Sequence, residues 1–275
     1  MDEKMTLYKV FRNVLGPIYR FWYNPKIIGK ENIPKEGSMV IVGNHIHIMD
    51  QCNVVISTKR NLHYMAKKEY FDGKFAWFFR SSGCISVDRS KKDEEATSQA
   101  LEVLKNNHAL GLFPEGTRNG LKEEYIKILY ENYNMESKID YKDFYKKVKK
   151  NKTSQMHYLE KLLEQKIITR AEFIDNIYNG NEFLKDLILN HRITMEEYLE
   201  NILLPFKFGA VSMAHKTNSC IVPFAITGEY KFRSKNLVVR IGEPFEPSED
   251  LEFTNQLLRE KIKDLMKENF KNSGK

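Results

Sequence analysis

Residues 43–50 read Gly43-Asn44-His45-Ile46-His47-Ile48-Met49-Asp50, and they mark the point where an apolar run gives way to a polar turn. The run before them, 39–42, is short and β-branched, which is typical of a buried strand. In an unbroken helix, side chains five residues apart point about 140° away from each other. His45 and Asp50 therefore meet only if His45 lies in the turn and Asp50 in the first turn of a following helix. The carboxylate then holds one ring nitrogen, and the other can act as a general base.

Short apolar runs alternate along the chain with segments of helical periodicity. This alternation is typical of an α/β fold with a mostly parallel central sheet flanked by helices. Pro223 lies inside one apolar run and lacks an N–H donor, so we expect it in a central strand only at the strand's start or at a bulge. The expected strands are 39–42, 62–66, 83–87, 109–113, 221–227 and 237–241, and the expected helices are 51–58, 71–79 (aromatic and buried), 92–106, one ending near 216, and 249–270.

Several ionisable side chains follow directly on these expected strands. His45, Lys67, Arg89 and Arg118 each come after a strand end. In parallel sheets, ligands bind outside the carboxyl ends of the strands, so topology can gather these groups at one edge. A general base with several cations at one rim suggests a substrate that carries both a hydroxyl group and a phosphate.

Composition narrows the function classes. The net charge of +7 favours an anionic partner: nucleic acid, a phosphorylated metabolite or an anionic lipid surface. We expect no nucleic acid, because the aromatic residues fall within apolar stretches and not in a basic, aromatic-interleaved motif. Cys52, Cys84 and Cys220 are widely spaced and form no CxxC pair, so neither a disulfide framework nor a zinc site is indicated.

The first 24 residues form a separate amphipathic segment. Apolar residues such as Leu7, Val10 and Val14 recur at helical spacing, with Lys9, Arg12 and Arg20 at other positions. Gly16-Pro17 is expected to kink or break this helix. No apolar run reaches the roughly 18 residues that span a bilayer. The segment therefore either lies in a membrane interface or packs on the domain as a terminal helix.

Residues 121–203 interrupt the alternation of strands and helices. This block holds fourteen basic and fifteen acidic side chains and a single glycine, Gly180. Thr169 and Thr194 are each followed three residues later by glutamate, which is the capping-box pattern of a helix start. We expect an all-α insertion, with a possible internal duplication, between the two parts of the main domain, 25–120 and 204–275.

Four motifs in order resemble those of the glycerolipid acyltransferase family. Residues 44–50 match its NHxxxxD motif, 83–89 resemble its second block, 113–118 match its FPEGTR block, and 221–224 its fourth. The resemblance covers about 5–119 and 205–270 and leaves out 121–203. His47 departs from the pattern, because many members carry a small hydroxyl residue there.

The resemblance implies a reaction and roles for named residues. A fatty acyl chain would pass from an acyl thioester to the sn-2 hydroxyl of 1-acyl-sn-glycerol 3-phosphate, making phosphatidic acid in phospholipid biosynthesis. His45 would take the hydroxyl proton and Asp50 would fix the imidazole tautomer. Thr117, Arg118 and the amide of Gly116 would bind the acceptor phosphate. Three further residues have lesser roles: Arg89 and Lys67 would add charge, and Glu115 would pair with an arginine and position it.

The same resemblance implies the partners and the cellular setting. We expect no metal and no cofactor, with acyl-CoA or acyl carrier protein as co-substrate and a lyso-phospholipid as acceptor. The protein would act peripherally on the cytoplasmic face of the cell membrane. Two alternatives remain: another O-acyltransferase, using glycerol 3-phosphate, dihydroxyacetone phosphate or a different lyso-lipid, and a non-catalytic lipid-binding protein on the same fold.

Overall fold

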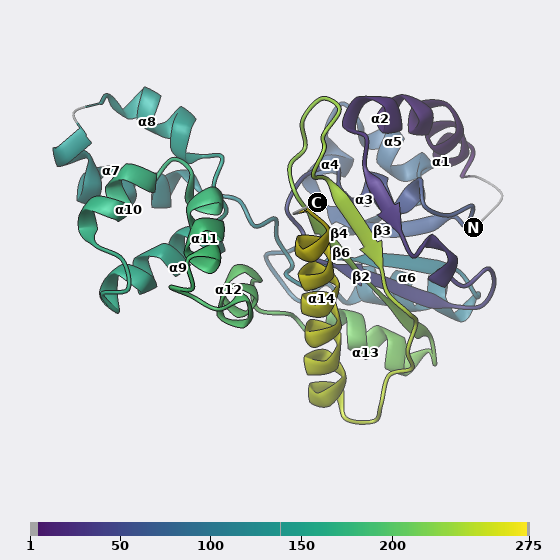
Figure 1. Cartoon of the computed structure of the whole chain (residues 1–275). Coiled ribbons are helices and arrows are strands. Elements are labelled where there is room, and N and C mark those ends of the chain that lie inside the picture. The colour runs from purple at the N-terminus through teal and green to yellow at the C-terminus, as the bar shows by residue number, and fades with distance from the viewer. Residues whose placement is uncertain (1–4, 138, 274–275) are drawn as a thin grey trace. The chain divides into compact units, whose positions relative to one another are not determined.

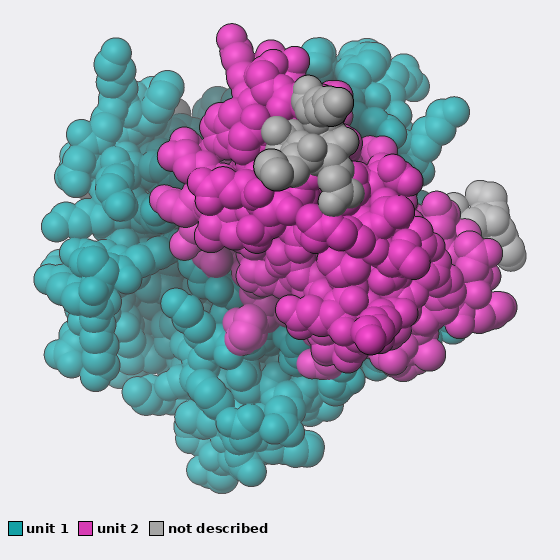
Figure 2. Space-filling model, turned by 90° about the vertical axis from the view of Figure 1, so that its left-hand side faces the viewer, with its two compact units in different colours: residues 1–116, 206–275 teal, residues 117–205 magenta. Residues whose placement is uncertain are grey.

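The computed structural model describes residues 5–137 and 139–273, which fall into two compact units. The first comprises Met1–Gly116 and Phe206–Lys275, and the second Thr117–Pro205 (Figure 2). The second unit extends a few residues beyond the expected insertion at each end, and over its described residues it contains helices and no strands (Figure 1).

Seven strands form one sheet within the described residues, in the order β1-β7-β6-β2-β5-β3-β4. All neighbouring strands pair in parallel except β6 and β7, which are antiparallel. The expected α/β fold with a mostly parallel sheet is confirmed. The strands are β1 (Lys26–Ile28), β2 (Met39–Gly43), β3 (Leu62–Lys67), β4 (Ile85–Val87), β5 (Ala109–Leu112), β6 (Cys220–Thr227) and β7 (Val238–Ile241).

Helices cover both faces of the sheet. On one face α6 (Glu94–Lys105), α13 (Gly209–Lys216) and α14 (Leu251–Ser273) pack on the central strands. On the other face lies the N-terminal helical segment, whose buried side chains join those of α3 in one core cluster with the strands. That segment comprises α1 (Thr6–Val10), a π-helical turn (Phe11–Leu15) and α2 (Gly16–Tyr23), and α3 spans Asp50–Val55. The central strand β2 is buried along its whole length, so its end is a rigid support for the turn that follows.

The structure differs from the sequence expectations at β1, whereas Pro223 lies at a bulge as expected. Residues 26–28, expected as part of a turn-rich lead, pair with β7 as a short edge strand. Pro223 lies within β6, which pairs with β2 on one side and with β7 on the other. The pairing on the β7 side shifts by one residue at this point, from Phe224–Ile241 to Ile221–Phe245. The carbonyl of Pro223 accepts a hydrogen bond of 2.8 Å from the Gly242 amide at this bulge. The missing N–H therefore falls where the ladder is already interrupted.

Two helical expectations also need correction. The aromatic segment 71–79 is divided into α4 (Glu69–Asp72) and α5 (Ala76–Ser81), because the chain becomes extended at Gly73. Its Phe75 and Trp77 side chains are exposed, not buried. Gly16-Pro17 does not break the N-terminal helix. The helix instead widens into the π-helical turn just before Pro17, which occupies the first turn of α2 and has no N–H to donate.

The second unit is built from six helices over its described residues. The helices α10 and α12 begin with the same N-terminal cap. The hydroxyl groups of Thr169 and Thr194 each accept a hydrogen bond from the backbone amide three residues further on. The carboxylates of Glu172 and Glu197 accept from the two threonine amides in return, at 2.7 Å each, so both capping boxes are present. The helices are α7 (Glu123–Ser137), α8 (Tyr141–Val148), α9 (Thr153–Glu164), α10 (Arg170–Asn176), α11 (Gly180–Leu189) and α12 (Met195–Ile202).

Candidate active site

His45 and Asp50 form a hydrogen-bonded dyad beyond the carboxyl end of β2. His45 lies in the turn and Asp50 is the first residue of α3, the arrangement that their spacing requires. The ring Nδ1 of His45 lies 2.8 Å from Asp50 Oδ2. The same carboxylate oxygen accepts from the backbone amides of Ile46 at 2.7 Å and His47 at 2.8 Å. The fully buried carboxylate thus holds both the ring and the turn that carries it.

The other ring nitrogen of His45 is left for chemistry. Because Nδ1–H donates to the carboxylate, Nε2 is the unprotonated nitrogen of the neutral ring. Among the described residues Nε2 has no hydrogen-bond partner, and the side chain is 14% exposed. The imidazole stacks on Phe113 with ring centroids 4.0 Å apart and planes 12° apart. Packing and the carboxylate together give the imidazole one orientation.

Asn44 links this turn to the neighbouring strand. Its side-chain amide donates to the Ile226 carbonyl at 2.9 Å, and its oxygen accepts from the Ile226 amide at 2.8 Å. Asn44 is buried away from water, so these two hydrogen bonds satisfy the polar atoms of its side chain. This contact spans 182 residues of chain, and nothing in the local pattern around Asn44 predicts it.

The turn after β5 supports the dyad from the other side. Glu115 is buried and accepts from the backbone amide of His45 at 2.7 Å. This contact positions the turn that carries His45. The expected pairing of Glu115 with an arginine stays a prediction.

Gly116 has a different role from the one expected. Its amide donates to the Phe113 carbonyl at 3.0 Å, so this N–H is used within the turn and is not available to a phosphate. The φ of +67° is in the left-handed region that favours glycine. A Cβ atom at Gly116 would lie 2.8 Å from Lys207 Cε, so the missing side chain lets Lys207 approach. Lys207 is held there by its own amide, which donates to the Pro114 carbonyl at 2.8 Å.

The other residues expected at the phosphate belong to different units: Arg89 and Lys67 to the first, and Thr117 and Arg118 to the second. Arg89 follows β4 and its Nη1 donates to the Gly116 carbonyl at 2.8 Å, so topology does bring these two residues together. Lys67 is the exposed last residue of β3. Thr117 and Arg118 are the first residues of the second unit, both are exposed, and they follow Gly116 directly in the chain.

Tyr230 also contacts the dyad. Its hydroxyl group donates to Asp50 Oδ1 at 2.6 Å, across 180 residues of chain. It lies in the loop between β6 and β7, which has no motif around it. Sequence reasoning missed both Tyr230 and Lys207, because only the fold brings their loops to this edge.

Comparison with known proteins identifies the family. The sequence model of the acyltransferase family matches residues 24–227, which include the dyad and all four motifs. The chain belongs to the acyltransferase family. The resemblance seen in the motifs is thereby confirmed.

Named relatives of this acyltransferase are 1-acyl-sn-glycerol-3-phosphate acyltransferases. The Bacillus subtilis protein is 31% identical over 114 residues, which are 41% of this chain and 57% of the relative. The Saccharomyces cerevisiae protein is 32% identical over 127 residues, 42% of this chain and 37% of the relative. The matched segments thus span less than two thirds of these relatives. The crystal structure of the 1-acyl-sn-glycerophosphate acyltransferase from Thermotoga maritima has the same fold, with a TM-score of 0.53 at 17% identity over 97% of this chain and 84% of that one.

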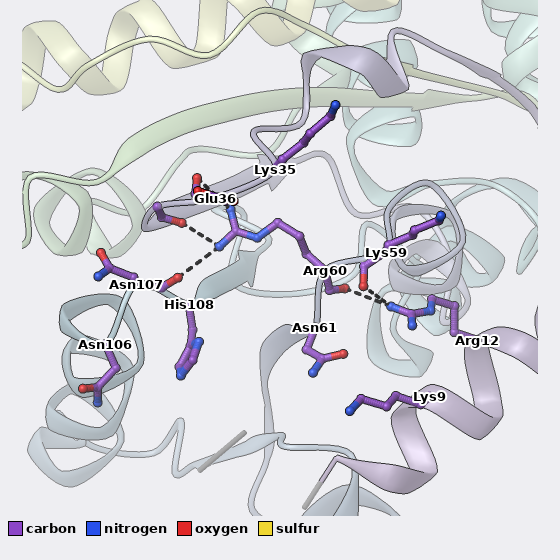
Figure 3. A pocket seen from close by; sticks show the side chains of 11 residues that line it. Lys9, Arg12, Lys35, Glu36, Lys59, Arg60, Asn61, Asn106, Asn107 and His108 are labelled. Carbon is purple, nitrogen blue, oxygen red and sulfur yellow. Dashed lines mark hydrogen bonds between the residues drawn. The ribbon is translucent and has the colours of Figure 1, made fainter. Parts of the chain in front are cut away.

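The acyltransferase has a basic cavity of about 680 Å³ at the opposite edge of the sheet. Residues that line it, such as Gly37, Asn61 and His108, lie within two residues of the starts of β2, β3 and β5. Figure 3 shows the guanidinium of Arg60 directed at backbone oxygens, and it donates to the carbonyls of Pro34, Glu36, Gly37 and Asn107. Arg60 therefore ties together the loops that enter this edge of the sheet.

The acyltransferase offers no cysteine nucleophile beside the dyad. Burial, and then the charge of Asp50, raise the pKa of the Cys52 thiol to about 12. A thiol with this pKa remains protonated at neutral pH and is a poor nucleophile. In the part of the chain that the structure describes, no group of three or more His, Cys, Asp or Glu side chains is placed to hold a metal ion.

Proposed function

We propose that this acyltransferase moves a fatty acyl chain from an acyl thioester to the sn-2 hydroxyl of 1-acyl-sn-glycerol 3-phosphate, forming phosphatidic acid. The observation that carries the proposal is the dyad, in which Asp50 Oδ2 holds His45 Nδ1 at 2.8 Å and leaves Nε2 for a substrate proton. The names of the relatives support the choice of acceptor.

The dyad can perform the transfer without a covalent enzyme intermediate. Nε2 of His45 takes the proton of the acceptor hydroxyl while that oxygen attacks the thioester carbonyl. The resulting imidazolium is stabilised by the carboxylate of Asp50. When the tetrahedral intermediate collapses, the carbon–sulfur bond breaks, and His45 returns its proton to the thiolate that leaves. The products are the ester and a free thiol.

The acceptor phosphate needs cations near the dyad. Arg89 and Lys207 both contact Gly116, on the turn whose Glu115 holds the His45 amide. Arg118, two residues further on, presents the planar guanidinium that suits a phosphate. We assign phosphate binding to Arg118 with Thr117, assisted by Arg89, Lys67 and Lys207.

A panel of acceptors tests the proposal. Purified protein is given 1-acyl-sn-glycerol 3-phosphate, glycerol 3-phosphate, dihydroxyacetone phosphate or monoacylglycerol, each with acyl-CoA or acyl carrier protein as donor. Mass spectrometry of the products should find phosphatidic acid as the main product. A faster reaction with glycerol 3-phosphate would contradict the assigned acceptor, and the donor arms identify the acyl carrier.

Removing Arg118 should separate phosphate binding from chemistry. In Arg118→Ala we expect kcat/KM for 1-acyl-sn-glycerol 3-phosphate to fall about 10–100-fold, the value of one or two charge-assisted hydrogen bonds. The rate with neutral monoacylglycerol should change less than twofold. Arg170→Ala, an exposed arginine of the same unit, is the matched control. Equal losses with both acceptors would mean that Arg118 does not read the phosphate.

We propose that the N-terminal segment contacts a lipid surface and that the protein binds the cytoplasmic face of the membrane peripherally. None of the helices over the described residues is both long and apolar enough to cross a bilayer. Met5, Tyr8 and Tyr19 are buried against the domain, while the opposite face carries exposed apolar side chains. These are Val10, Val14, Ile18, Phe21 and Trp22, with Phe232 of a neighbouring loop against the last two.

Arg12 and Arg20 attach this segment to the domain. The guanidinium of Arg12 donates to the Lys59 carbonyl, and Arg20 Nη2 donates to the Ile56 carbonyl at 2.6 Å. Both arginines satisfy carbonyls that follow α3, because a helix end leaves such groups without partners. The side chain of Leu7 lies outside the described residues. Lipid contact is thus assigned to the apolar side chains.

Polar substitutions on the apolar face should weaken membrane binding. We expect Val10→Ser/Val14→Ser/Ile18→Ser to reduce sedimentation with anionic liposomes at least tenfold, because three apolar side chains that enter a membrane interface contribute a few kcal/mol to binding. Thermal unfolding should be little changed, since all three side chains are exposed.

A matched variant tests the second unit. Ile128→Ser/Leu189→Ser removes exposed apolar groups from that unit and should leave sedimentation unchanged. If instead this variant loses lipid binding and the N-terminal variant retains it, the membrane contact belongs to the second unit.

A further inference from the structure

The second carboxylate oxygen of Asp50 is held by a tyrosine. The hydroxyl group of Tyr230 lies 2.6 Å from Asp50 Oδ1. Burial, and then the charge of Asp50, raise the pKa of Tyr230 well above its ordinary value. The group therefore stays protonated and is the donor in this short bond. Because Oδ2 is used by His45 and two backbone amides, both oxygens of the carboxylate are fixed.

The chain of hydrogen bonds continues from Tyr230 into the N-terminal segment. The side-chain amide of Asn53 donates to the Tyr230 oxygen at 2.6 Å, and Asn53 Oδ1 accepts from the Tyr19 hydroxyl at 3.0 Å. Burial raises the pKa of Tyr19, so this hydroxyl also remains a donor. Its other neighbour, the carbonyl of Met49, is more distant at 3.4 Å. Every bond from Tyr19 to Asp50 has the same sense, with the donor on the side away from Asp50. Asn53 takes both roles, because its oxygen accepts from Tyr19 and its nitrogen donates to Tyr230.

Ring packing and backbone contacts hold the same elements together. Tyr230 is stacked on His47 at 4.1 Å and meets Tyr23 edge-on at 5.5 Å. The loop that carries Tyr230 is attached to α2 by the Arg233 amide, which donates to the Trp22 carbonyl at 2.6 Å. Helix α2 thus contacts the chain of hydrogen bonds twice, directly through Tyr19 and through the loop of Tyr230.

We propose that Tyr230 and Tyr19 are positioning residues which couple the seating of helix α2 to the orientation of the Asp50–His45 dyad. The same helix presents Ile18, Phe21 and Trp22 on its outer face. The element assigned to the lipid surface is therefore linked to the carboxylate of Asp50 through Asn53 and Tyr230. The consequence for activity rests on the proposed acyl transfer. The coupling itself is a property of the folded chain.

Three single hydroxyl deletions in the full-length protein test this coupling. Tyr230→Phe removes the bond to Asp50 and the bond from Asn53. Tyr19→Phe removes the bond to Asn53 and the longer contact to Met49, and both variants keep the ring. Tyr23→Phe is the matched control, because Tyr23 packs between the other two rings and its hydroxyl makes no hydrogen bond with a described residue. Two quantities are measured: the NMR resonance of the His45 Nδ1 proton, and kcat and KM for a detergent-dispersed acceptor.

We expect kcat to fall about tenfold in Tyr230→Phe, as for the loss of one hydrogen bond to a charged group, with KM changed less than twofold. The loss in Tyr19→Phe should be smaller, because its hydroxyl acts through Asn53. The His45 Nδ1 proton resonance should shift in the same order, and Tyr23→Phe should change neither quantity. The Val10→Ser/Val14→Ser/Ile18→Ser variant should keep the resonance although it loses liposome binding.

Two results would overturn the coupling. One is an unchanged His45 resonance and kcat in folded Tyr230→Phe, and the other is an equal effect of Tyr23→Phe, which would assign the effect to packing. If Tyr230→Phe does not fold, Tyr19→Phe against Tyr23→Phe decides the same question. The resonance does not depend on turnover. A wild-type protein that fails to acylate the lyso-lipid would therefore refute the proposed function, while the resonances still judge the coupling.

Discussion

Replacing His45 by alanine is expected to abolish acyl transfer while the protein remains folded. Nε2 is the group that removes the hydroxyl proton, and general-base catalysis is typically worth about 10²–10⁴-fold. The fold should survive because the ring lies at the end of β2 and not in the core, and because the backbone amide of residue 45 can still donate to Glu115. Initial rates and thermal unfolding, measured on the same preparation, check both parts.

His108→Ala is the matched control for this substitution. His108 precedes β5 at the opposite edge of the sheet, on the rim of the basic cavity. We expect its loss to leave the rate within about threefold of the wild type, since no step of the proposed transfer uses it. Near-normal turnover in folded His45→Ala, or equal losses in the two variants, would refute the general-base mechanism.

Replacing Asp50 by asparagine should reduce kcat about 10²–10⁴-fold with little effect on KM. The amide side chain has almost the same shape, but it carries no charge to stabilise the imidazolium that forms as the proton moves. It also replaces one of two acceptor oxygens by an NH₂ group, so Tyr230 or the backbone amides of the turn lose an acceptor. Steady-state rates with a saturating acceptor measure this loss.

Asp93→Asn separates the catalytic role of Asp50 from its structural one. The carboxylate of Asp93 also accepts from two backbone amides, those of Ala96 and Asp88, and it caps α6 with no histidine beside it. We expect Asp93→Asn to lose about 1 kcal/mol of stability, as for other N-caps, and to keep full turnover. If both variants lose only stability, Asp50 holds the turn and does not assist the base.

Much of the fold follows from periodicity. The runs 39–42 and 109–113 are continuous and apolar because their strands are covered by helices on both faces, and such runs are recognisable without a structure. β1 escaped notice because three residues carry too little pattern, and its pairing partner β7 is more than two hundred residues away. The bulge at Pro223 could not be located from the local sequence, because it depends on the register of a second strand.

The candidate site divides in the same way. His45 and Asp50 are five residues apart, so one turn and the start of one helix suffice to bring them together, and the sequence alone determines that geometry. The partners that orient them are distant in sequence: Glu115 reaches His45 from another strand end, and Tyr230 reaches Asp50 from the loop beyond β6. No local pattern encodes such contacts, because the sequence around a loop tyrosine is the same whether or not the fold brings a carboxylate near it.

The sequence by itself therefore determined the α/β class, the dyad, the family motifs and the all-helical second unit, since each depends on residues close together in the chain. Only the tertiary structure decided which oxygen of Asp50 holds which donor, that the Gly116 amide is already used, and that Arg12 and Arg20 bind carbonyls. The physical reason is that a polar group's role depends on the partners that replace water around it. Those partners are chosen when strands and loops from distant parts of the chain meet.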